Sequence, residues 1–328
     1  MRRVLITGGA GFIGSHLCEA LLERGDEVFV IDDLSTGCYD NIRHLRGDDR
    51  FHLTVSSILD VPTLSVLVEQ VDVVFHLGAA VGVEKIVTNP VRTIETNILG
   101  GHSLLTTATR YNKLCLLTST SEVYGKNSKV PFVEDDDSVL GPTSKSRWSY
   151  ACSKAVNEFL ALAYHHERGL PVIIARLFNT TGPRQTGRYG MVLPRFVSQA
   201  LNGTPLTVFG SGEQRRCFAD VSDVIKGLLA LVEHPGAVGE VFNVGNPEEI
   251  SINDLATRVK SLVGGSSEIH HIPYDRAYQP GFEDMERRVP SIAKIAKLVG
   301  YKPVVKLDET IERIADYVQK AQSVEIGH

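Results

Sequence analysis

The chain has 328 residues, of which 34 are Lys or Arg and 39 are Asp or Glu, so its formal net charge is -5. This mild acidity argues against a broad nucleic-acid-binding face. A composition that is 43% hydrophobic and 22% charged is typical of a globular enzyme and excludes a disordered or fibrous chain. The apolar run at residues 4–6 is too short for a signal peptide or a membrane span, so we expect a cytoplasmic protein that binds no membrane.

The cysteines carry no sign of a metal site. All five, Cys18, Cys38, Cys115, Cys152 and Cys217, are isolated, without a CxxC pair and without a disulfide pattern. We therefore expect five reduced thiols and no structural metal.

Strands and helices are predicted to alternate from residue 3 to about residue 178. Short β-branched runs alternate there with amphipathic helical patterns, which is typical of repeated βαβ units and a parallel sheet. We predict six strands, at residues 4–7, 27–31, 51–55, 73–77, 114–118 and 172–176, with helices between most of them. Six such strands make a doubly wound parallel sheet, so the fold class is α/β.

Two of the predicted helices have long apolar faces. One carries Ile94, Ile98, Leu105 and Ala108 at helical spacing, and the other carries Val156, Phe159, Leu160 and Ala163. Two interpretations remain open: both faces pack on the sheet, or they pair across a two-fold axis as the helix bundle of a homodimer.

The pattern changes after Asn179 to shorter segments that Gly and Pro interrupt. We predict helices near 191–202, 222–233, 251–264 and 308–320, which belong to a smaller C-terminal α/β substrate lobe. The predicted division is a nucleotide-binding domain over residues 1–178 and a substrate lobe over residues 179–328, with an approximate boundary that the chain can cross back over. The acidic run at residues 134–137 is expected in a solvated loop without a function.

A glycine-rich turn links the first predicted strand to the first helix. Gly8, Gly11 and Gly14 stand where a tight turn and a close phosphate approach leave no room for a side chain. A pyrophosphate would then lie at the N-terminus of the helix. This order of strand, glycines and helix predicts a Rossmann-type dinucleotide site.

The second predicted strand ends in Asp32 and Asp33. An acidic residue here accepts hydrogen bonds from the adenine ribose, and its charge would repel a 2′-phosphate, which predicts NAD and not NADP. For Asp33 a second interpretation remains open, in which it caps the turn that follows. The predicted cofactor-binding residues are Gly8, Gly11, Phe12, Ile13, Gly14, Asp32, Asp33, Leu77, Ala79 and Lys154.

Tyr150 and Lys154 are the candidate acid–base pair. A phenol with a pKa of about 10 is a poor base at neutral pH unless a nearby cation favours the phenolate. Lys154 lies one helical turn after Tyr150 on the same face, and together with an oxidised nicotinamide it would lower the pKa of the phenol. An exposed i,i+4 pair is the alternative, and the nearby dinucleotide motif favours catalysis.

Three motifs together, at residues 7–14, 150–154 and 179–184, resemble the extended short-chain dehydrogenase/reductase family over essentially the whole chain. Within this family the likeness is to nucleotide-sugar epimerases, dehydratases and decarboxylases, which oxidise a sugar with tightly bound NAD. The resemblance implies that Thr120, at the end of the fifth strand, binds the C4 oxygen of the sugar. It also implies a UDP-sugar substrate and a homodimer.

Glu122 separates the possible reactions. Dehydratases of this family have an aspartate where this chain has Ser121, so dehydration is disfavoured. Residues 120–125, 141–148 and 283–290 resemble decarboxylases of UDP-glucuronate, in which a glutamate and a late arginine attend the carboxylate. These two residues correspond to Glu122 and Arg288.

We therefore predict decarboxylation of UDP-glucuronate to UDP-xylose or to its 4-keto precursor. The alternative is a nucleotide-sugar 4-epimerase that interconverts UDP-glucose and UDP-galactose, or UDP-glucuronate and UDP-galacturonate. A non-catalytic NAD-binding regulator is a more distant one. The intact set of Thr120, Tyr150 and Lys154 argues against the regulator.

The substrate lobe supplies cations at loops and helix starts. Planar guanidinium groups suit paired phosphate oxygens. By resemblance, Arg216 and Asn179 contact the diphosphate, and residues 206–209 flank the uracil. The predicted substrate-binding residues are Asn179, Arg184, Arg195, Val208, Arg216 and Arg288.

Overall fold

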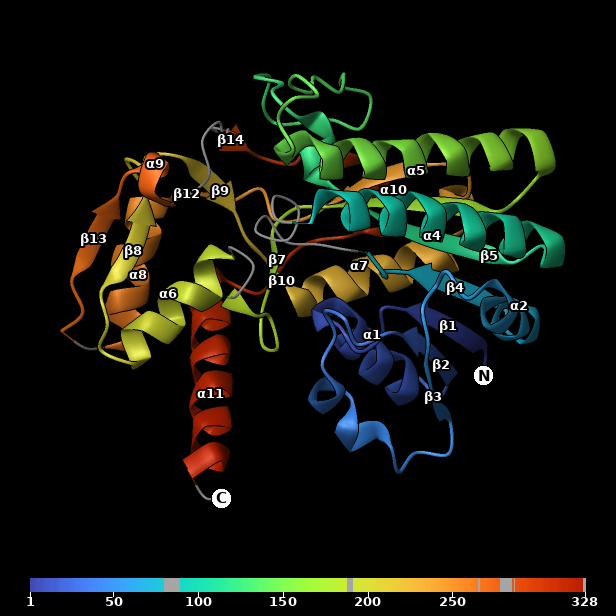
Figure 1. The fold of residues 1–328 in the computed structure, drawn as a ribbon, viewed down its shortest axis with the longest axis horizontal. Helices are drawn as coiled ribbons and strands as arrows, with labels where there is room; N and C mark the ends of the chain where they lie inside the picture. Colours follow the sequence, from blue (N-terminus) through green and yellow to red (C-terminus); the bar gives the residue numbers. More distant parts are fainter. Residues whose placement is uncertain (80–88, 188–190, 265, 278–284, 286, 327–328) are drawn as a thin grey trace.

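The computed structural model describes the chain except for residues 80–88, 188–190, 265, 278–284, 286 and 327–328. Over the described residues, a seven-stranded parallel sheet runs through the larger lobe in the order β11-β6-β5-β4-β1-β2-β3 (Figure 1). Its strands are β1 (Arg3–Thr7), β2 (Glu27–Asp32), β3 (Phe51–Val55), β4 (Val73–His76), β5 (Leu114–Thr120), β6 (Val172–Leu177) and β11 (Val241–Val244). The predicted doubly wound α/β sheet is confirmed, and all six predicted strands are present.

The strand order reverses next to β1. The chain builds β1, β2 and β3 toward one edge, and then returns to place β4 on the other side of β1. In a doubly wound sheet, ligands bind at such a point, beyond the carboxyl ends of the strands. The glycine-rich turn after β1 lies at this position.

Helices cover both faces of the sheet. On one face lie α1 (Phe12–Glu23), α7 (Val221–Glu233) and α10 (Ala293–Val299), and on the other lie α2 (Val61–Gln70), α4 (Pro90–Tyr111) and α5 (Arg147–Arg168). Alternate residues of the strands point to opposite faces, so Ile6 packs against α1 and Leu5 packs toward α2 and α4. Each face is therefore a separate buried core, which makes the sheet a rigid support for its carboxyl edge.

The chain does not divide cleanly at residue 178. β11, α7 and α10 all come from beyond that point, yet they complete the sheet and one of its helical layers. β6 and β11 are parallel neighbours, and parallel strands need a long crossover connection. In this connection the chain passes through the small lobe, with α6 and β8, before it returns to the sheet. The two lobes thus share the C-terminal half of the sequence.

The smaller lobe packs three helices against two short strands. These are α6 (Val192–Leu201), α8 (Ile252–Val263), α11 (Leu307–Ile326), β8 (Leu206–Phe209) and β13 (Ile269–Ile272), and they share one hydrophobic core. All four helices predicted beyond residue 179 are present, although α7 belongs to the larger lobe. The remaining short elements are β7 (Thr180–Thr181) and β10 (Ala219–Asp220), which pair with each other, β9 (Arg215–Cys217), β12 (Glu249–Ser251) and β14 (Arg287–Arg288), which form a second small sheet, and α9 (Tyr274–Ala277).

The long helices α4 and α5 lie side by side, each with a buried and an exposed apolar face (Figure 1). Leu105 and Ala108 of α4 are buried on the sheet, as the first interpretation of these helices required. Val156 and Phe159 of α5 instead face solvent. None of the described helices has both the length and the apolar character that crossing a membrane requires.

Candidate active site

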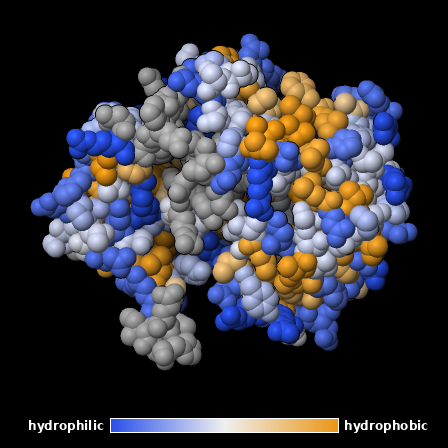
Figure 2. Space-filling model, in the orientation of Figure 1, coloured by the Kyte–Doolittle hydropathy of each residue, from blue (hydrophilic) through white to orange (hydrophobic). Residues whose placement is uncertain are grey.

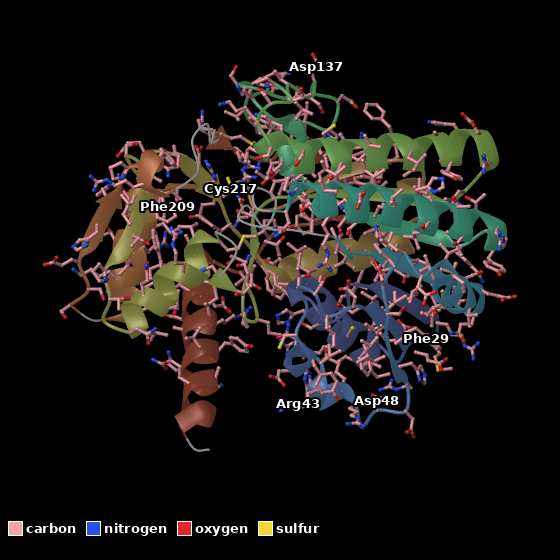
Figure 3. The ribbon with its side chains drawn as sticks, viewed as in Figure 1. Phe29, Arg43, Asp48, Asp137, Phe209 and Cys217 are labelled. Atoms are coloured by element: carbon pink, nitrogen blue, oxygen red, sulfur yellow. The ribbon has the colours of Figure 1, made fainter. Side chains whose placement is uncertain are left out.

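A cavity of about 810 Å³ opens at the carboxyl edge of the sheet, and residues of both lobes line it. In Figure 3, Phe209 marks its substrate-lobe side and Cys217, at the end of β9, lies between the lobes. The predicted residues that line the cavity are Gly8, Gly11, Phe12, Ile13, Gly14, Asp32, Asp33, Leu77, Ala79, Thr120, Glu122, Tyr150, Lys154, Asn179, Arg184, Arg195, Arg216 and Arg288. The structure therefore brings together residues that are spread over 280 positions of the sequence.

The glycine-rich turn fits a phosphate group closely. Gly8 has a φ of +76°, which favours glycine, and a Cβ there would lie 2.8 Å from the backbone nitrogen of Gly78. A Cβ at Gly14 would lie 2.7 Å from Cα of Gly9. Because the turn cannot hold side chains at these positions, the amides at the start of α1 remain open to an anion, as dinucleotide binding requires.

The two aspartates after β2 have different surroundings. Asp32 is buried and accepts hydrogen bonds of 2.9 Å from the amides of Ala10 and Leu34, so it holds the glycine-rich turn against the end of β2. Burial raises the pKa of Asp32 above its ordinary value. Asp33 accepts a bond of 2.9 Å from the amide of Ser35 and also lines the cavity, so turn capping and a cofactor contact are compatible.

The end of β5 presents Thr120 and Glu122. The amide of Glu122 donates to the hydroxyl oxygen of Thr120 at 3.3 Å, which leaves the Thr120 hydroxyl proton available to a ligand. The predicted strand stops at residue 118, whereas β5 continues to Thr120 because Ser119 and Thr120 pair with β6. This extension places the Thr120 hydroxyl at the edge of the cavity.

Tyr150 and Lys154 both line the cavity from α5. Burial raises the pKa of Tyr150 and Glu122 raises it further, while Arg147 and Arg288 lower it. Lys154 is itself buried, and burial lowers its pKa to about 8 against the opposing charge of Glu158. Arg147 and Arg288 are therefore protein charges that favour the phenolate, and the predicted effect of Lys154 together with an oxidised nicotinamide stays a prediction.

A buried ionic cluster stands beside Tyr150. Glu122 is paired with Arg147 of α5, and its Oε1 lies 3.5 Å from Nη1 of Arg288 in β14. Burial alone would raise the pKa of Glu122, but Arg147 and Arg288 outweigh it and hold this pKa below its ordinary value. Two guanidinium groups thus face one carboxylate at the wall of the cavity, beside Tyr150.

Arg147 was missed by the sequence analysis, although a signal for it exists. It lies three residues before Tyr150, so Arg147, Tyr150 and Lys154 share one face of α5. Only 4% of its side chain is exposed. A buried arginine needs a partner, but its spacing to Tyr150 did not reveal that this partner is Glu122.

The remaining predicted substrate residues have distinct anchors. Arg216 is buried on β9, and Asn179 donates to the carbonyl of Cys217 at 2.8 Å. Arg195 lies over the ring of Phe209, with its guanidinium carbon 4.1 Å from the ring centre. Arg184 is held at 2.5 Å by Glu19 of α1, the helix that follows the glycine-rich turn, so its role toward the substrate stays a prediction.

The prediction for Val208 is wrong. Its side chain is fully buried in the core of the small lobe and does not line the cavity, whereas that of Phe209 does. Side chains alternate along a strand, so a one-residue difference in register exchanges the core and the cavity.

Of the segment at 283–290 that resembles decarboxylases, residues 283, 284 and 286 lie outside the described part of the chain.

Comparisons with known proteins agree with this geometry. The family model described as GDP-mannose 4,6 dehydratase matches residues 5–314. The chain is 40% identical to the UDP-N-acetyl-alpha-D-glucosaminuronate decarboxylase of Bacillus cytotoxicus, over 98% of this chain and 99% of that protein. It is 39% identical to UDP-glucuronic acid decarboxylase 1 of Xenopus tropicalis, over 97% of this chain and 72% of that protein.

A solved structure shows the same likeness in three dimensions. The UDP-glucuronic acid 4-epimerase of Bacillus cereus, in complex with UDP-glucuronic acid and NAD, superposes with a TM-score of 0.87. It is 31% identical, and the match covers 97% of this chain and 99% of that chain.

Proposed function

The chain belongs to the GDP-mannose 4,6-dehydratase family of extended short-chain dehydrogenases/reductases, and from this premise we propose that it is an NAD-dependent decarboxylase of a UDP-linked uronic acid. The observation that carries the proposal is the cluster of Glu122, Arg147 and Arg288, which places two guanidinium groups in the cavity beside Tyr150. Guanidinium groups bind a carboxylate through charge-assisted hydrogen bonds, which a uronic acid offers and a neutral hexose does not.

The glycine-rich turn and Asp33 would hold NAD, which would supply the hydride acceptor for oxidation at C4 of the sugar. Tyr150 takes the proton of the C4 hydroxyl, and Thr120 orients that hydroxyl through its own proton. Lys154 supplies a positive charge at the same end of the cavity while it is protonated. Together these residues convert the C4 alcohol into a ketone.

A ketone at C4 makes the C6 carboxylate part of a β-keto acid. The bond between C5 and C6 then breaks, carbon dioxide leaves, and its bonding electron pair moves through C5 onto the C4 oxygen as an enolate. Tyr150, now protonated, and Thr120 donate hydrogen bonds to this oxygen. Arg147 and Arg288 hold the carboxylate until it leaves, and Glu122 keeps both guanidinium groups in place.

The nucleotide half of the substrate would lie against the small lobe. We assign the diphosphate to Arg216 and Asn179, and the base to the surface formed by Phe209 and the stacked Arg195. The relatives described above are named for UDP-linked sugars, which favours a uridine nucleotide.

UDP-glucuronate is the first candidate substrate. Decarboxylases named for it are 39% identical to this chain in Xenopus tropicalis and in Arabidopsis thaliana. UDP-N-acetylglucosaminuronate is the second candidate, because the relative named for it matches nearly end to end. A uronate 4-epimerase remains the alternative reaction, because the Bacillus cereus enzyme shares the fold and a uronate ligand.

We also propose a homodimer that pairs α4 and α5 of two copies. Hydrophobic side chains gather over these helices on the surface that Figure 2 shows. Val91, Leu99 and Phe159 are 67%, 50% and 76% exposed, and such a patch on paired helices favours burial against a second copy. The cytoplasmic location stays a prediction.

The decisive experiment incubates the purified protein separately with UDP-glucuronate, UDP-N-acetylglucosaminuronate and UDP-glucose. Mass spectrometry and proton NMR follow the products. A decarboxylase converts one of the two uronates to a product that is lighter by the mass of carbon dioxide, and it leaves UDP-glucose unchanged.

Unchanged mass with a new C4 proton signal would make the protein a 4-epimerase and would refute the proposal. Retention of the label from C4-deuterated substrate in the final sugar distinguishes return of the hydride from release of a 4-keto sugar and NADH. No turnover of any of the three substrates, with NAD bound, would favour a regulatory protein.

A further inference from the structure

Glu122 and Arg288 are 166 residues apart in the sequence, and a single buried amide joins the segments that carry them. Glu122 lies in a short 3-10 helix, Ser121–Tyr124, directly after β5. Arg288 lies in β14, which enters the site from the C-terminal part of the chain. The amide belongs to Asn243 on β11, the edge strand of the sheet.

Asn243 is fully buried and uses both ends of its side chain. Its Oδ1 accepts the hydroxyl of Tyr124 at 2.7 Å, and Tyr124 ends the helix that carries Glu122. Its Nδ2 donates to the carbonyls of Phe132 at 3.0 Å and Ser291 at 3.4 Å. One side chain therefore contacts the Glu122 segment at one end and the Arg288 segment at the other.

The Arg288 segment is fastened at the same place by its backbone. The amide of Phe132 donates to the carbonyl of Val289 at 2.8 Å, and the amide of Ser291 donates to the carbonyl of Phe132 at 2.8 Å. Arg288 directly precedes this clamp. Its reach into the cavity therefore depends on where Asn243 holds Phe132.

The orientation of the amide is determined by its neighbours. Arg176 donates to the Tyr124 hydroxyl oxygen at 2.9 Å, and an arginine can only donate, so the Tyr124 proton is directed to Asn243. Tyr124 also stacks on Phe132, with ring centres 4.6 Å apart. Arg176 is held in turn by Glu158 at 2.7 Å, so the arrangement has few ways to relax.

The acidic run at residues 134–137 was predicted to lie in a solvated loop without a function. Its first residue, Glu134, is instead part of this hydrogen-bonded arrangement. The Oε1 atom of Glu134 accepts the backbone amide of Asn243 at 2.8 Å, and the carbonyl of Glu134 accepts from Arg176 at 2.8 Å. Through Glu134, the loop that contains Phe132 is attached both to β11, at Asn243, and to the neighbouring strand β6, at Arg176.

We propose that Asn243 is a positioning residue for the loss of carbon dioxide, because it sets the separation of Glu122 and Arg288. The proposal rests on the proposed function, in which these two residues attend the sugar carboxylate. Oxidation at C4 relies on Thr120, Tyr150 and Lys154, none of which Asn243 contacts in the hydrogen bonds above. The two steps should therefore respond differently to a change at Asn243.

The test compares Asn243→Ala and Tyr124→Phe with the unchanged holoenzyme in single turnovers of UDP-glucuronate, or of the uronate that the enzyme decarboxylates. Nicotinamide absorbance measures C4 oxidation, and label released from C6 measures carbon dioxide. In both variants we expect carbon dioxide release to slow on the order of ten- to a hundredfold, the cost of misplacing reacting groups by about 1 Å. Nicotinamide reduction should slow by a clearly smaller factor, because Asn243 bonds to none of Thr120, Tyr150 and Lys154 and would act on Tyr150 only through the charges of Glu122 and Arg288.

Tyr164→Phe is the matched control. Its hydroxyl is bonded to Thr106 at 2.8 Å in a partly buried position between α4 and α5, so the variant also loses one tyrosine hydrogen bond, away from Asn243. Both rates should stay within about twofold there. If Asn243→Ala does not fold, Tyr124→Phe alone decides, because it removes one hydroxyl and keeps the ring.

Equal slowing of oxidation and carbon dioxide release, or unchanged release in Tyr124→Phe, would overturn the role of Asn243. Failure of the proposed function looks different, because the unchanged enzyme would then release no carbon dioxide from either uronate. In that case the proposal for Asn243 falls with it.

Discussion

Glu122 keeps its charge inside the protein because two guanidinium groups face it. The charges of Arg147 and Arg288 overcome the burial that would raise the pKa of this carboxyl. The same two arginines oppose the rise in the pKa of Tyr150 that burial and Glu122 cause. One cluster of three side chains therefore acts on the base Tyr150, and under the proposed function it would also hold the substrate carboxylate.

Changing Glu122 or Arg288 should affect carbon dioxide release more than NAD binding. We expect Glu122→Gln and Arg288→Ala to slow decarboxylation by at least about a hundredfold, because each removes a charge from the cluster that would hold the sugar carboxylate. Affinity for NAD, measured by titration calorimetry, should change by less than about threefold, as the two sites share no contact. Unchanged decarboxylation in both variants would remove these residues from the mechanism.

His76 should make the stability of the protein depend on acid. It is buried at the end of β4, where its Nδ1 lies 2.8 Å from Oγ1 of Thr7, and burial lowers its pKa from 6.5 to about 3. A histidine kept neutral by folding contributes stability that is fully present above pH 6.5 and is lost as the pH falls toward 3. The loss is up to about 1.4 kcal/mol for each pH unit.

Urea unfolding of the unchanged protein and of His76→Gln, at about pH 7 and about pH 5, measures this dependence. The free energy of unfolding should fall more steeply with acid in the unchanged protein than in the variant. The exposed His102, changed to Gln, is the control and should leave the slope as it is. Parallel slopes in all three proteins would show that His76 is not kept neutral.

At the scale of elements, the helical repeat of α5 brings the candidate catalytic side chains to one face. Arg147, Tyr150, Lys154 and Glu158 follow each other at intervals of three or four residues, so one helix face carries them all. The turn between β1 and α1 works in the opposite way, because its chemistry is a backbone without side chains. Both α5 and the turn between β1 and α1 pack against the rigid sheet, and this packing determines how their chemical groups are oriented.

Gly14→Ala tests the turn. The new Cβ would collide with the carbonyl oxygen of Gly8 and lie 2.7 Å from Cα of Gly9, and backbone atoms cannot move aside cheaply. We expect the variant to lose about 1–3 kcal/mol of stability and at least about tenfold in NAD affinity. Gly47→Ala is the control, since its Cβ would meet no atom within 4 Å.

NAD content after purification and thermal unfolding measure the two effects. Full NAD occupancy in Gly14→Ala would contradict the placement of the pyrophosphate at this turn.

At the scale of the whole molecule, the active site exists only where the lobes meet. The larger lobe contributes the turn, the end of β5 and α5, while β9 and β14 bring Arg216 and Arg288 from the other side. The outer faces of α4 and α5 lie away from the sheet, and their exposed apolar side chains are the surface for the proposed dimer.

Phe159→Glu should convert the proposed dimer to a monomer. Phe159 is 76% exposed on α5, and a carboxylate there would face its own copy near the two-fold axis of the pair. Light scattering after size-exclusion chromatography measures the mass. Val304→Glu, at a residue of 61% exposure outside these helices, should leave the mass unchanged. A monomer in the unchanged protein at micromolar concentration would contradict the dimer.

Local patterns were enough for much of this protein. The alternation of strands and helices predicted the doubly wound sheet, because the hydrophobic period of each segment follows from its own residues. The spacing of Gly8, Gly11 and Gly14 and the helical turn between Tyr150 and Lys154 also lie within a few residues of chain, so they can be read directly. Val208 shows the limit, because the face of a strand depends on which side the core covers.

The sequence by itself determined the fold class, the dinucleotide turn, the positions of Thr120, Tyr150 and Lys154, and the family resemblance that singled out Glu122 and Arg288. Only the tertiary structure decided that Arg147 pairs with Glu122, that the C-terminal half returns to complete the sheet with β11, and that Asn243 joins the segments of Glu122 and Arg288. The physical reason is the distance along the chain over which each interaction acts. Periodicity and turn chemistry act between neighbours along the chain, whereas a buried charge or amide finds its partner wherever the fold delivers one.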